Sequence, residues 1–330
     1  MRTPTHAAHR IHRGLRRSVA ACMAGLSTGV VAVALVAAPA SASGTTLHTA
    51  TSAPGDTLRV VPLQVGQSSS MTMGGRFEPA SGQEQAGTAV TDLSYSSNWS
   101  GFVDGTSTKR GVLTAVGATF NQVSSDWSVP RLQISLPNGY VGNWDGIGGV
   151  FGTEAIVQAG TIEDFQGLRP SYQAFIENYP NPTLVVEAPV APFDNVQSAI
   201  AEESGTWTVT LTDTTEGWTT GPVNIAAAYE SLGYSFVSPD TETAEWITED
   251  PSCATALCPF ADFSPVVSSE VEDSATGAPA SRTPQQFLMI NAEGIPQTGI
   301  FPANISTATT YAASYRDFAV IRLGLGFVGR

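Results

Sequence analysis

The sequence predicts an all-β fold, an antiparallel sandwich or barrel, for the part of the chain that begins near Tyr95. Short runs of β-branched and aromatic residues, separated by Gly, Pro, Asn and Asp, follow one another there without a sustained helical period. The segment Thr206–Thr212 alternates Trp207, Val209 and Leu211 with threonines, which is typical of a half-buried antiparallel strand. About 235 residues of this texture are enough for one such domain.

Further segments have the same short apolar pattern, and we expect each of them to be a strand. They are residues 115–120, 156–159, 171–176, 183–187, 244–247, 263–267 and 318–323. Residues 195–203 show only a weak helical pattern, and the chain contains no internal repeat.

The first 42 residues differ from the rest, and we expect them to be a signal peptide. Five arginines precede or begin an apolar run from Val19 to Val36, and Ala40-Ser41-Ala42 supplies a small-residue cleavage site. Residues 43–92 are rich in Ser, Thr, Gly and Gln, so we expect a propeptide or disordered leader that buries little core. The sequence therefore predicts a secreted (extracellular) protein whose β-sandwich domain spans residues 93–330.

The charge and the missing residue types narrow the function. Without residues 1–42 the chain holds ten basic and twenty-nine acidic residues, a formal charge of −19. This charge repels nucleic acid and anionic membrane, and it is best tolerated at low pH, where many carboxylates are protonated.

All four histidines lie at or before His48, which excludes from the domain a Ser-His-Asp triad, a Cys-His pair and a histidine-bound zinc. An enzyme built from this domain would use carboxylates, amides or hydroxyls, and we expect no metal and no cofactor.

The two cysteines of the expected domain, Cys253 and Cys258, flank a four-residue loop. Because exported chains reach an oxidising compartment, this pair predicts a local disulfide and no free thiol nucleophile.

Two segments contain polar residues that could carry chemistry. Residues 244–250 alternate like a strand, so Glu245 and Glu249 share one face, but four residues span roughly 13 Å. That exceeds the roughly 5 to 9.5 Å between the two carboxylates of a glycosidase, so a partner must come from another strand. Gln158 lies among apolar residues of a second strand. Its amide either bonds to backbone as a structural residue or donates to a developing oxyanion in a groove.

These segments resemble the glutamic peptidases, also called eqolisins, over nearly all of residues 95–267. The similar motifs are 97–101 (SNWSG), 127–130 (WSVP), 144–149 (WDGIGG), 157–160 (VQAG), 172–180 (YQAFIENYP), 244–250 (AEWITED) and 260–265 (FADFSP), together with the Cys253–Cys258 loop. Each motif is short, but their order and spacing together are specific.

The resemblance implies a sandwich of two curved antiparallel sheets, a substrate groove on the concave side, and a catalytic Gln/Glu pair at Gln158 and Glu249. In such enzymes the glutamate acts on water as general base and then as acid toward the leaving nitrogen, while the amide stabilises the oxyanion. A base of this kind must stay ionised at acid pH. The resemblance also places Trp144, Tyr172, Phe175 and Glu177 as residues that line or support the groove, although a core role fits each of them as well.

One departure from the family pattern concerns Gly148, which stands where fungal members carry an aspartate. We expect either that Asp145, three residues earlier, compensates for the missing acid or that the pair is tuned to another pH. Residues 270–310 match the family poorly.

The sequence therefore predicts a secreted acid endopeptidase, made as a proenzyme, that acts as a monomer on extended polypeptides. Two alternatives remain at this point. A lectin- or glycosidase-like sandwich would use Trp127, Trp144 and Trp246 as sugar platforms, and a catalytically silent relative would bind peptides without cleaving them.

Overall fold

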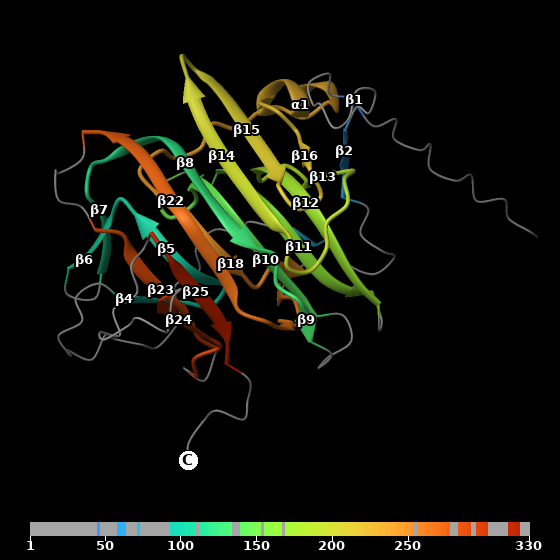
Figure 1. Ribbon diagram of the computed structural model, residues 1–330. Coiled ribbons are helices and arrows are strands. Elements are labelled where there is room, and N and C mark those ends of the chain that lie inside the picture. Colours follow the sequence, from blue (N-terminus) through green and yellow to red (C-terminus); the bar gives the residue numbers. More distant parts are fainter. Residues whose placement is uncertain are drawn as a thin grey trace, which may run out of the picture. The chain divides into compact units, whose positions relative to one another are not determined.

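The computed structural model describes residues 45–46, 58–63, 71–72, 93–109, 112–133, 139–152, 155–166, 169–253, 256–277, 283–291, 295–302 and 316–323 (Figure 1). The chain divides into two units, Met1–Ala42 and Ser43–Arg330, and every described residue belongs to the second. The expected signal peptide lies outside the described residues.

Two large sheets form the second unit. The first sheet has ten strands in the order β1 (Thr45–Thr46), β2 (Arg59–Pro62), β13 (Leu184–Val186), β12 (Arg169–Tyr179), β11 (Ile156–Gln166), β10 (Tyr140–Gly148), β18 (Ala244–Glu249), β5 (Trp99–Asp104), β23 (Gln285–Met289) and β4 (Leu93–Ser96). The second has the order β16 (Trp218–Thr219), β15 (Thr206–Asp213), β14 (Asn195–Glu203), β8 (Thr119–Ser128), β22 (Val266–Thr276), β25 (Phe318–Arg322) and β24 (Thr298–Pro302), with β17 (Val223–Asn224) beside β15.

Smaller elements complete the described part of the chain. They are the sheet β20 (Ala256–Leu257), β19 (Ser252–Cys253) and β3 (Met71–Thr72), the pair β21 (Asp262–Phe263) and β9 (Leu132–Gln133), the hairpin β6 (Thr106–Lys109) and β7 (Val112–Ala115), and helix α1 (Ile225–Ser231). The side chain of Asn224 caps the helix by accepting from the backbone N–H of Ala227 at 3.0 Å. The helix lies beside β15 (Figure 1).

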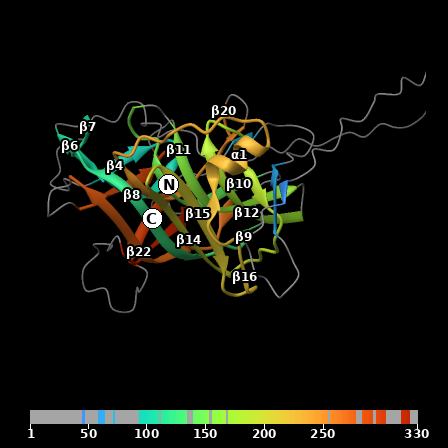
Figure 2. The same ribbon diagram turned by 90° about the horizontal axis from the view of Figure 1, so that it is seen from above.

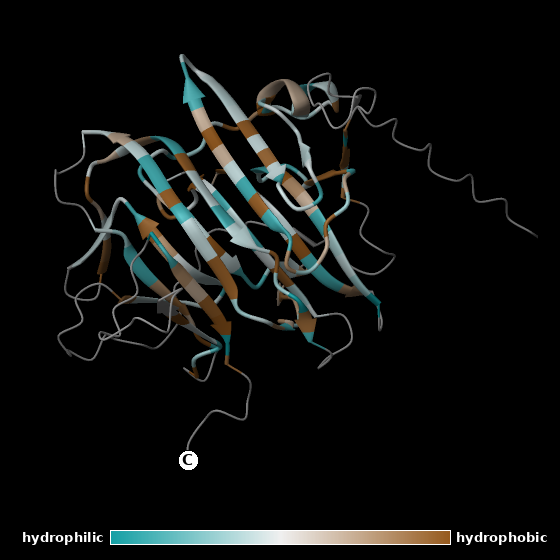
Figure 3. Cartoon of the chain, viewed as in Figure 1, coloured by the Kyte–Doolittle hydropathy of each residue, from teal (hydrophilic) through white to brown (hydrophobic). Residues whose placement is uncertain are grey.

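The two large sheets pack face to face, with β8, β14 and β15 in one layer and β10, β11 and β12 in the other (Figure 2). The main hydrophobic core fills the space between them. Strands of the second sheet alternate buried and more exposed residues, as β15 does with buried Trp207, Val209 and Leu211. Figure 3 shows hydrophobic and hydrophilic residues alternating along strands of this sheet. The prediction of an all-β antiparallel sandwich is thus confirmed.

The central strands of the first sheet are buried on both faces. All six residues of β18 and eight of the nine residues of β10 are buried. One face of these strands contacts the main core, and the other carries a second cluster that includes Trp99, Trp144 and Phe175. We call this second side the cluster face.

Most expected strands are present, and the exceptions have local causes. Residues 195–203 form β14 and no helix, because Val196, Ser198 and Ile200 alternate inward. Residues 116–118 form no strand, because Gly117 has a positive φ of 78° between β7 and β8.

The segment 43–92 contributes more than the sequence indicated. Its described residues include three short strands, and β2 adds directly to β13 with Val60 3% exposed in the main core. Val60 is therefore one core residue that the composition of this segment did not indicate. A four-residue apolar run in a polar context is too short to show a period.

Candidate functional site

Gln158 and Glu249 lie on the two neighbours of strand β10. Gln158 belongs to β11 and stands opposite Gly146, while Glu249 ends β18 and stands opposite Gly142. Because these glycines are four residues apart on β10, both side chains project from the same side of the sheet. That side is the cluster face, and both residues are 0% exposed.

Glu177 holds the amide of Gln158. The two residues are direct partners between β11 and β12, and Gln158 Nε2 donates to Glu177 Oε2 at 2.8 Å. Burial raises the pKa of Glu177 well above its ordinary value, and the charge of Glu249 raises it further. Gln158 Oε1 has no hydrogen-bond partner among the described residues. One N–H of the Gln158 amide is therefore held by the carboxyl group of Glu177, and the raised pKa of Glu177 favours the neutral form of that carboxyl group.

Trp144 holds the carboxyl group of Glu249. Its indole Nε1 donates to Glu249 Oε2 at 2.7 Å, and Trp99 packs edge-on against its ring at 5.1 Å between centroids. A Cβ at Gly146 would lie 2.8 Å from the Trp144 ring, so glycine gives the indole room to lie over β10. Trp144 is thus a hydrogen-bond donor to the candidate base, a role that the sequence did not indicate.

The other residues expected to line the groove divide between the two faces. Phe175 belongs to the cluster face, as Trp144 and Glu177 do. Tyr172 packs against the main core on the opposite face, and its hydroxyl accepts from the backbone N–H of Leu132 at 3.1 Å. The structure therefore brings Gln158, Glu249, Trp144, Phe175 and Glu177 to one side of the sheet and leaves Tyr172 on the other.

Asp145 does not replace the missing aspartate, so of the two expectations for Gly148 the tuning of the pair to another pH is the one that stays a prediction. Its carboxyl points between the two sheets, where Ser125 Oγ donates to it at 2.8 and 3.0 Å and Ser198 Oγ also donates. Burial raises the pKa of Asp145 to about 7. Successive residues of a strand face opposite sides, so the neighbour of Trp144 cannot reach the cluster face.

Gly148 has a structural reason for being glycine. Its φ is +101°, and a Cβ there would lie 2.5 Å from the carbonyl oxygen of Ala155 and 2.7 Å from that of Asp240. An aspartate at this position would need a shift of the backbone. Near Gly148, the acid on the cluster face is Glu245, which stands opposite Gly146. Burial raises the pKa of Glu245 well above its ordinary value, and the charge of Asp240 raises it further.

The predicted disulfide is present. Cys253 and Cys258 are joined with a Cα–Cα distance of 4.9 Å, and Cys253 packs against the cluster face three residues after Asp250. The bond therefore closes the loop that directly follows the strand of Glu249.

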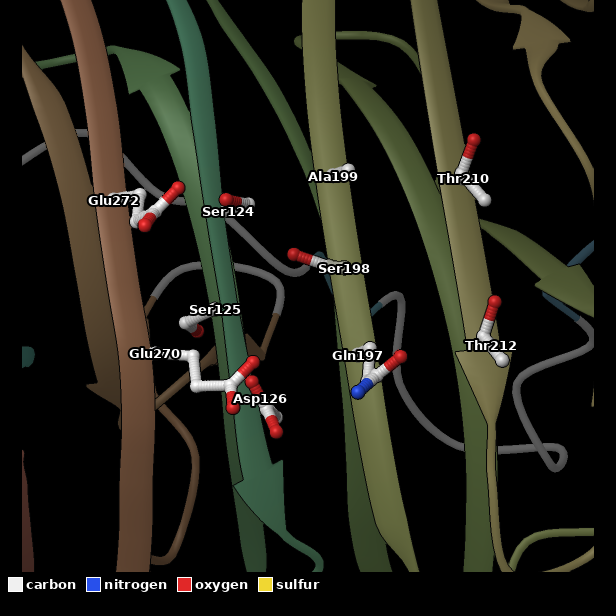
Figure 4. Close-up of a pocket in the computed structure, with 10 residues that line it drawn as sticks. All are labelled: Ser124, Ser125, Asp126, Gln197, Ser198, Ala199, Thr210, Thr212, Glu270 and Glu272. Carbon is white, nitrogen blue, oxygen red and sulfur yellow. The ribbon is translucent and has the colours of Figure 1, made fainter.

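A separate pocket lies on the second sheet. It has a volume of about 560 Å³, and Figure 4 shows the residues that line it. Three of them are acidic (Asp126, Glu270 and Glu272), and Ser125 and Ser198 belong to the lining as well. None of these residues belongs to the sheet that carries Gln158 and Glu249.

In the described part of the chain, no helix is long and apolar enough to cross a membrane, and no three His, Cys, Asp or Glu side chains converge as metal ligands.

Comparison with known proteins identifies the class to which this sandwich belongs. The family model of the Peptidase A4 family matches residues 97–315. Aspergillopepsin-2 from Aspergillus niger is 26% identical over 250 residues, which is 67% of this chain and 80% of that protein. The chain belongs to the Peptidase A4 family, the eqolisins, and is a glutamic endopeptidase that acts on polypeptides.

Solved structures of the family are also similar to this chain. Scytalido-glutamic peptidase with a transition state analog inhibitor is 20% identical, with a TM-score of 0.48, and the match covers 69% of this chain and 98% of that one. SCP-B, in a complex with the tripeptide Ala-Ile-His, is 21% identical with the same TM-score and the same coverage.

Proposed function

We propose that Gln158 and Glu249 are the catalytic pair of an acid endopeptidase. The observation that supports this assignment is the placement of both side chains on one face across β10, each held by its own hydrogen-bond partner. Trp144 donates to the carboxylate of Glu249, which stabilises its ionised form. Glu177 orients the amide of Gln158.

In this mechanism a water molecule attacks the scissile carbonyl carbon and gives a proton to Glu249. The carbonyl oxygen becomes an oxyanion, to which the free N–H of the Gln158 amide donates. Glu249 then gives its proton to the leaving nitrogen, the C–N bond breaks, and the carboxylate is restored. The residues supply base, acid and oxyanion donor, so the chain itself needs no metal or cofactor for these steps.

We further propose that residues 1–42 direct secretion, that residues 43–92 are a removable leader, and that residues 93–330 act as a monomer at acid pH. The leader proposal has support from Leu63, which packs against the cluster face. With Gln158 and Glu249 both 0% exposed, the described state is closed to substrate. Removal of the leader would uncover part of this face.

A single substitution tests the catalytic assignment. Glu249→Gln preserves the shape of the side chain and its contact with Trp144 but cannot accept the proton, so cleavage of a denatured protein at about pH 4 should be lost. The variant should remain folded, because glutamine keeps the shape of the side chain. Wild-type cleavage by this variant, with cut sites read by mass spectrometry, would exclude Glu249 as the base. A wild-type protein that binds peptide without cutting it would favour the catalytically silent alternative.

A further inference from the structure

Strand β13 is a sheet edge that residues of the proposed leader cover. In the first sheet, β13 has β12 on one side and β2 on the other, and among the described strands β1 alone follows beyond β2. Both β1 and β2 lie before residue 93. The described residues from 93 onward therefore end this side of the sheet at β13, with a row of backbone groups that need partners.

The leader supplies those partners as an antiparallel strand. Val60, Val61 and Pro62 stand opposite Val186, Val185 and Leu184. At the two ends of this ladder, Glu187 N–H donates to Arg59 O at 2.7 Å and Leu63 N–H donates to Thr183 O at 2.9 Å.

Pro62 fits the strand because of its position in the ladder. In an antiparallel pair, hydrogen-bonded and non-hydrogen-bonded residue pairs alternate. Because Arg59 and Leu63 belong to hydrogen-bonded pairs, Pro62 belongs to a non-hydrogen-bonded pair, and its backbone nitrogen points away from β13. Its missing N–H therefore costs no bond to β13.

The side chains of the leader strand divide between the two faces of the sheet. Val60 enters the main core and is 3% exposed. Leu63 packs against the cluster face, which also carries Gln158 and Glu249. Arg59 Nη1 lies 3.3 Å from Glu187 Oε2 at the surface. The edge thus accepts an apolar residue on the core side and a basic residue beside Glu187.

We propose that the edge of β13 is a docking site for an extended peptide, and that the leader segment Leu58–Leu63 is its occupant in the precursor. Recognition by strand addition takes its affinity from main-chain hydrogen bonds and its selectivity from alternate side chains. The ligand class is an extended chain with a β-branched residue at the position of Val60 and a basic residue immediately before it. This inference rests on the proposed function only in treating residues 43–92 as separable.

The test uses the full chain in the Glu249→Gln background, so that no self-cleavage occurs. Val60→Asp places a carboxylate in the core and should release the leader strand from β13. Hydrogen exchange measured by mass spectrometry should then show the backbone amides of residues 183–187 exchanging about tenfold faster or more, while those of β11 keep their protection. Val112→Asp is the matched control, because Val112 is 62% exposed, and it should change nothing at β13.

A synthetic peptide of residues 57–64, added in excess to the Val60→Asp chain, should restore protection at residues 183–187. The same peptide with Asp in place of Val60 should not. If Val60→Asp unfolds the whole domain, the milder Val60→Thr variant takes its place, because it keeps the shape of the side chain and buries a hydroxyl where valine has a methyl group.

Two results would overturn the proposal. The first is unchanged exchange at residues 183–187 in a folded Val60→Asp or Val60→Thr chain. The second is failure of the peptide to restore protection, including the case in which the exposed edge pairs with a second copy and the chain becomes a dimer. The intact mass of each chain is measured alongside the exchange. Self-cleavage in the Glu249→Gln background would count against the catalytic assignment, whereas the exchange of chains that remain intact tests the docking site alone.

Discussion

Asp145→Asn should weaken the dependence of stability on pH, because it removes a carboxyl group that titrates between the two sheets. The side chain of Asp145 is 1% exposed and accepts from serines of two strands of the opposite sheet. Asparagine keeps the shape of the side chain and can still accept from one serine and donate to the other. The variant therefore removes the ionisation while it preserves the contacts.

The sign and size follow from the pKa values. Burial raises the pKa of Asp145 from 3.8 to about 7, so the folded state holds the proton more tightly than the unfolded state does. The resulting stabilisation is fully present below pH 3.8 and is lost as the pH rises toward 7. At 1.36 kcal/mol per pKa unit, the wild-type free energy of unfolding should lose about 4 kcal/mol over this range through Asp145 alone.

Urea unfolding followed by circular dichroism at pH 4, 5, 6 and 7 measures this loss, with Glu249→Gln in every protein to prevent self-digestion. Other buried carboxyls also have raised pKa values, to about 8 for Glu163 and about 6 for Asp213, but they are common to both proteins. The difference between the two curves therefore isolates Asp145. Asp126→Asn is the comparison variant, because Asp126 lies beside Ser125 on the outer side of β8 and is the smallest cause of the raised pKa of Asp145. Its curve should therefore differ from the wild-type curve far less than that of Asp145→Asn. Parallel curves for wild type and Asp145→Asn would refute the reasoning.

Four further predictions concern the catalytic face, the disulfide and the leader. Gln158→Glu should lower kcat by about 10²–10³, with any remaining activity at the lowest pH, and near wild-type turnover in a folded variant would remove Gln158 from the mechanism. Trp144→Phe keeps a ring but loses the donor to Glu249, so kcat should fall by about 10- to 100-fold with little change in KM; a change in KM alone would instead assign Trp144 to substrate binding. Reduction of the Cys253–Cys258 bond should cost less than ~3 kcal/mol and leave the fold intact, while free thiols found by alkylation of the native protein would contradict the pairing. Glu249→Ala should keep residues 43–92 attached at acid pH, and normal maturation of that variant in a protease-free preparation would show that removal is not self-catalysed.

The sequence predicted the fold class well because alternation with a period of two survives in single strands such as β15. It also predicted that Glu249 needs a partner from another strand, since Glu245 and Glu249 are four positions apart on β18. It could not show that β10 lies between β11 and β18, because strand order depends on contacts distant in the sequence.

The side of the sheet on which two residues lie could have been worked out from the same alternation. Tyr172 is five residues from Glu177, and Asp145 is one residue from Trp144, so in a regular strand each must face away from that neighbour. The partnership of Trp144 with Glu249 was not predictable, because it requires the glycine at position 146 to admit the indole.

The alternation along β10 also ties two properties of the enzyme to adjacent residues. Trp144 reaches the candidate base on one side of the strand, and Asp145 reaches the serines of the opposite sheet on the other. A selection for survival at neutral pH would favour the loss of the buried acid at position 145, and any shift of the strand that accompanied this change would move the indole at position 144. Engineering of the pH range therefore has to be screened for turnover and stability together, because one strand determines both.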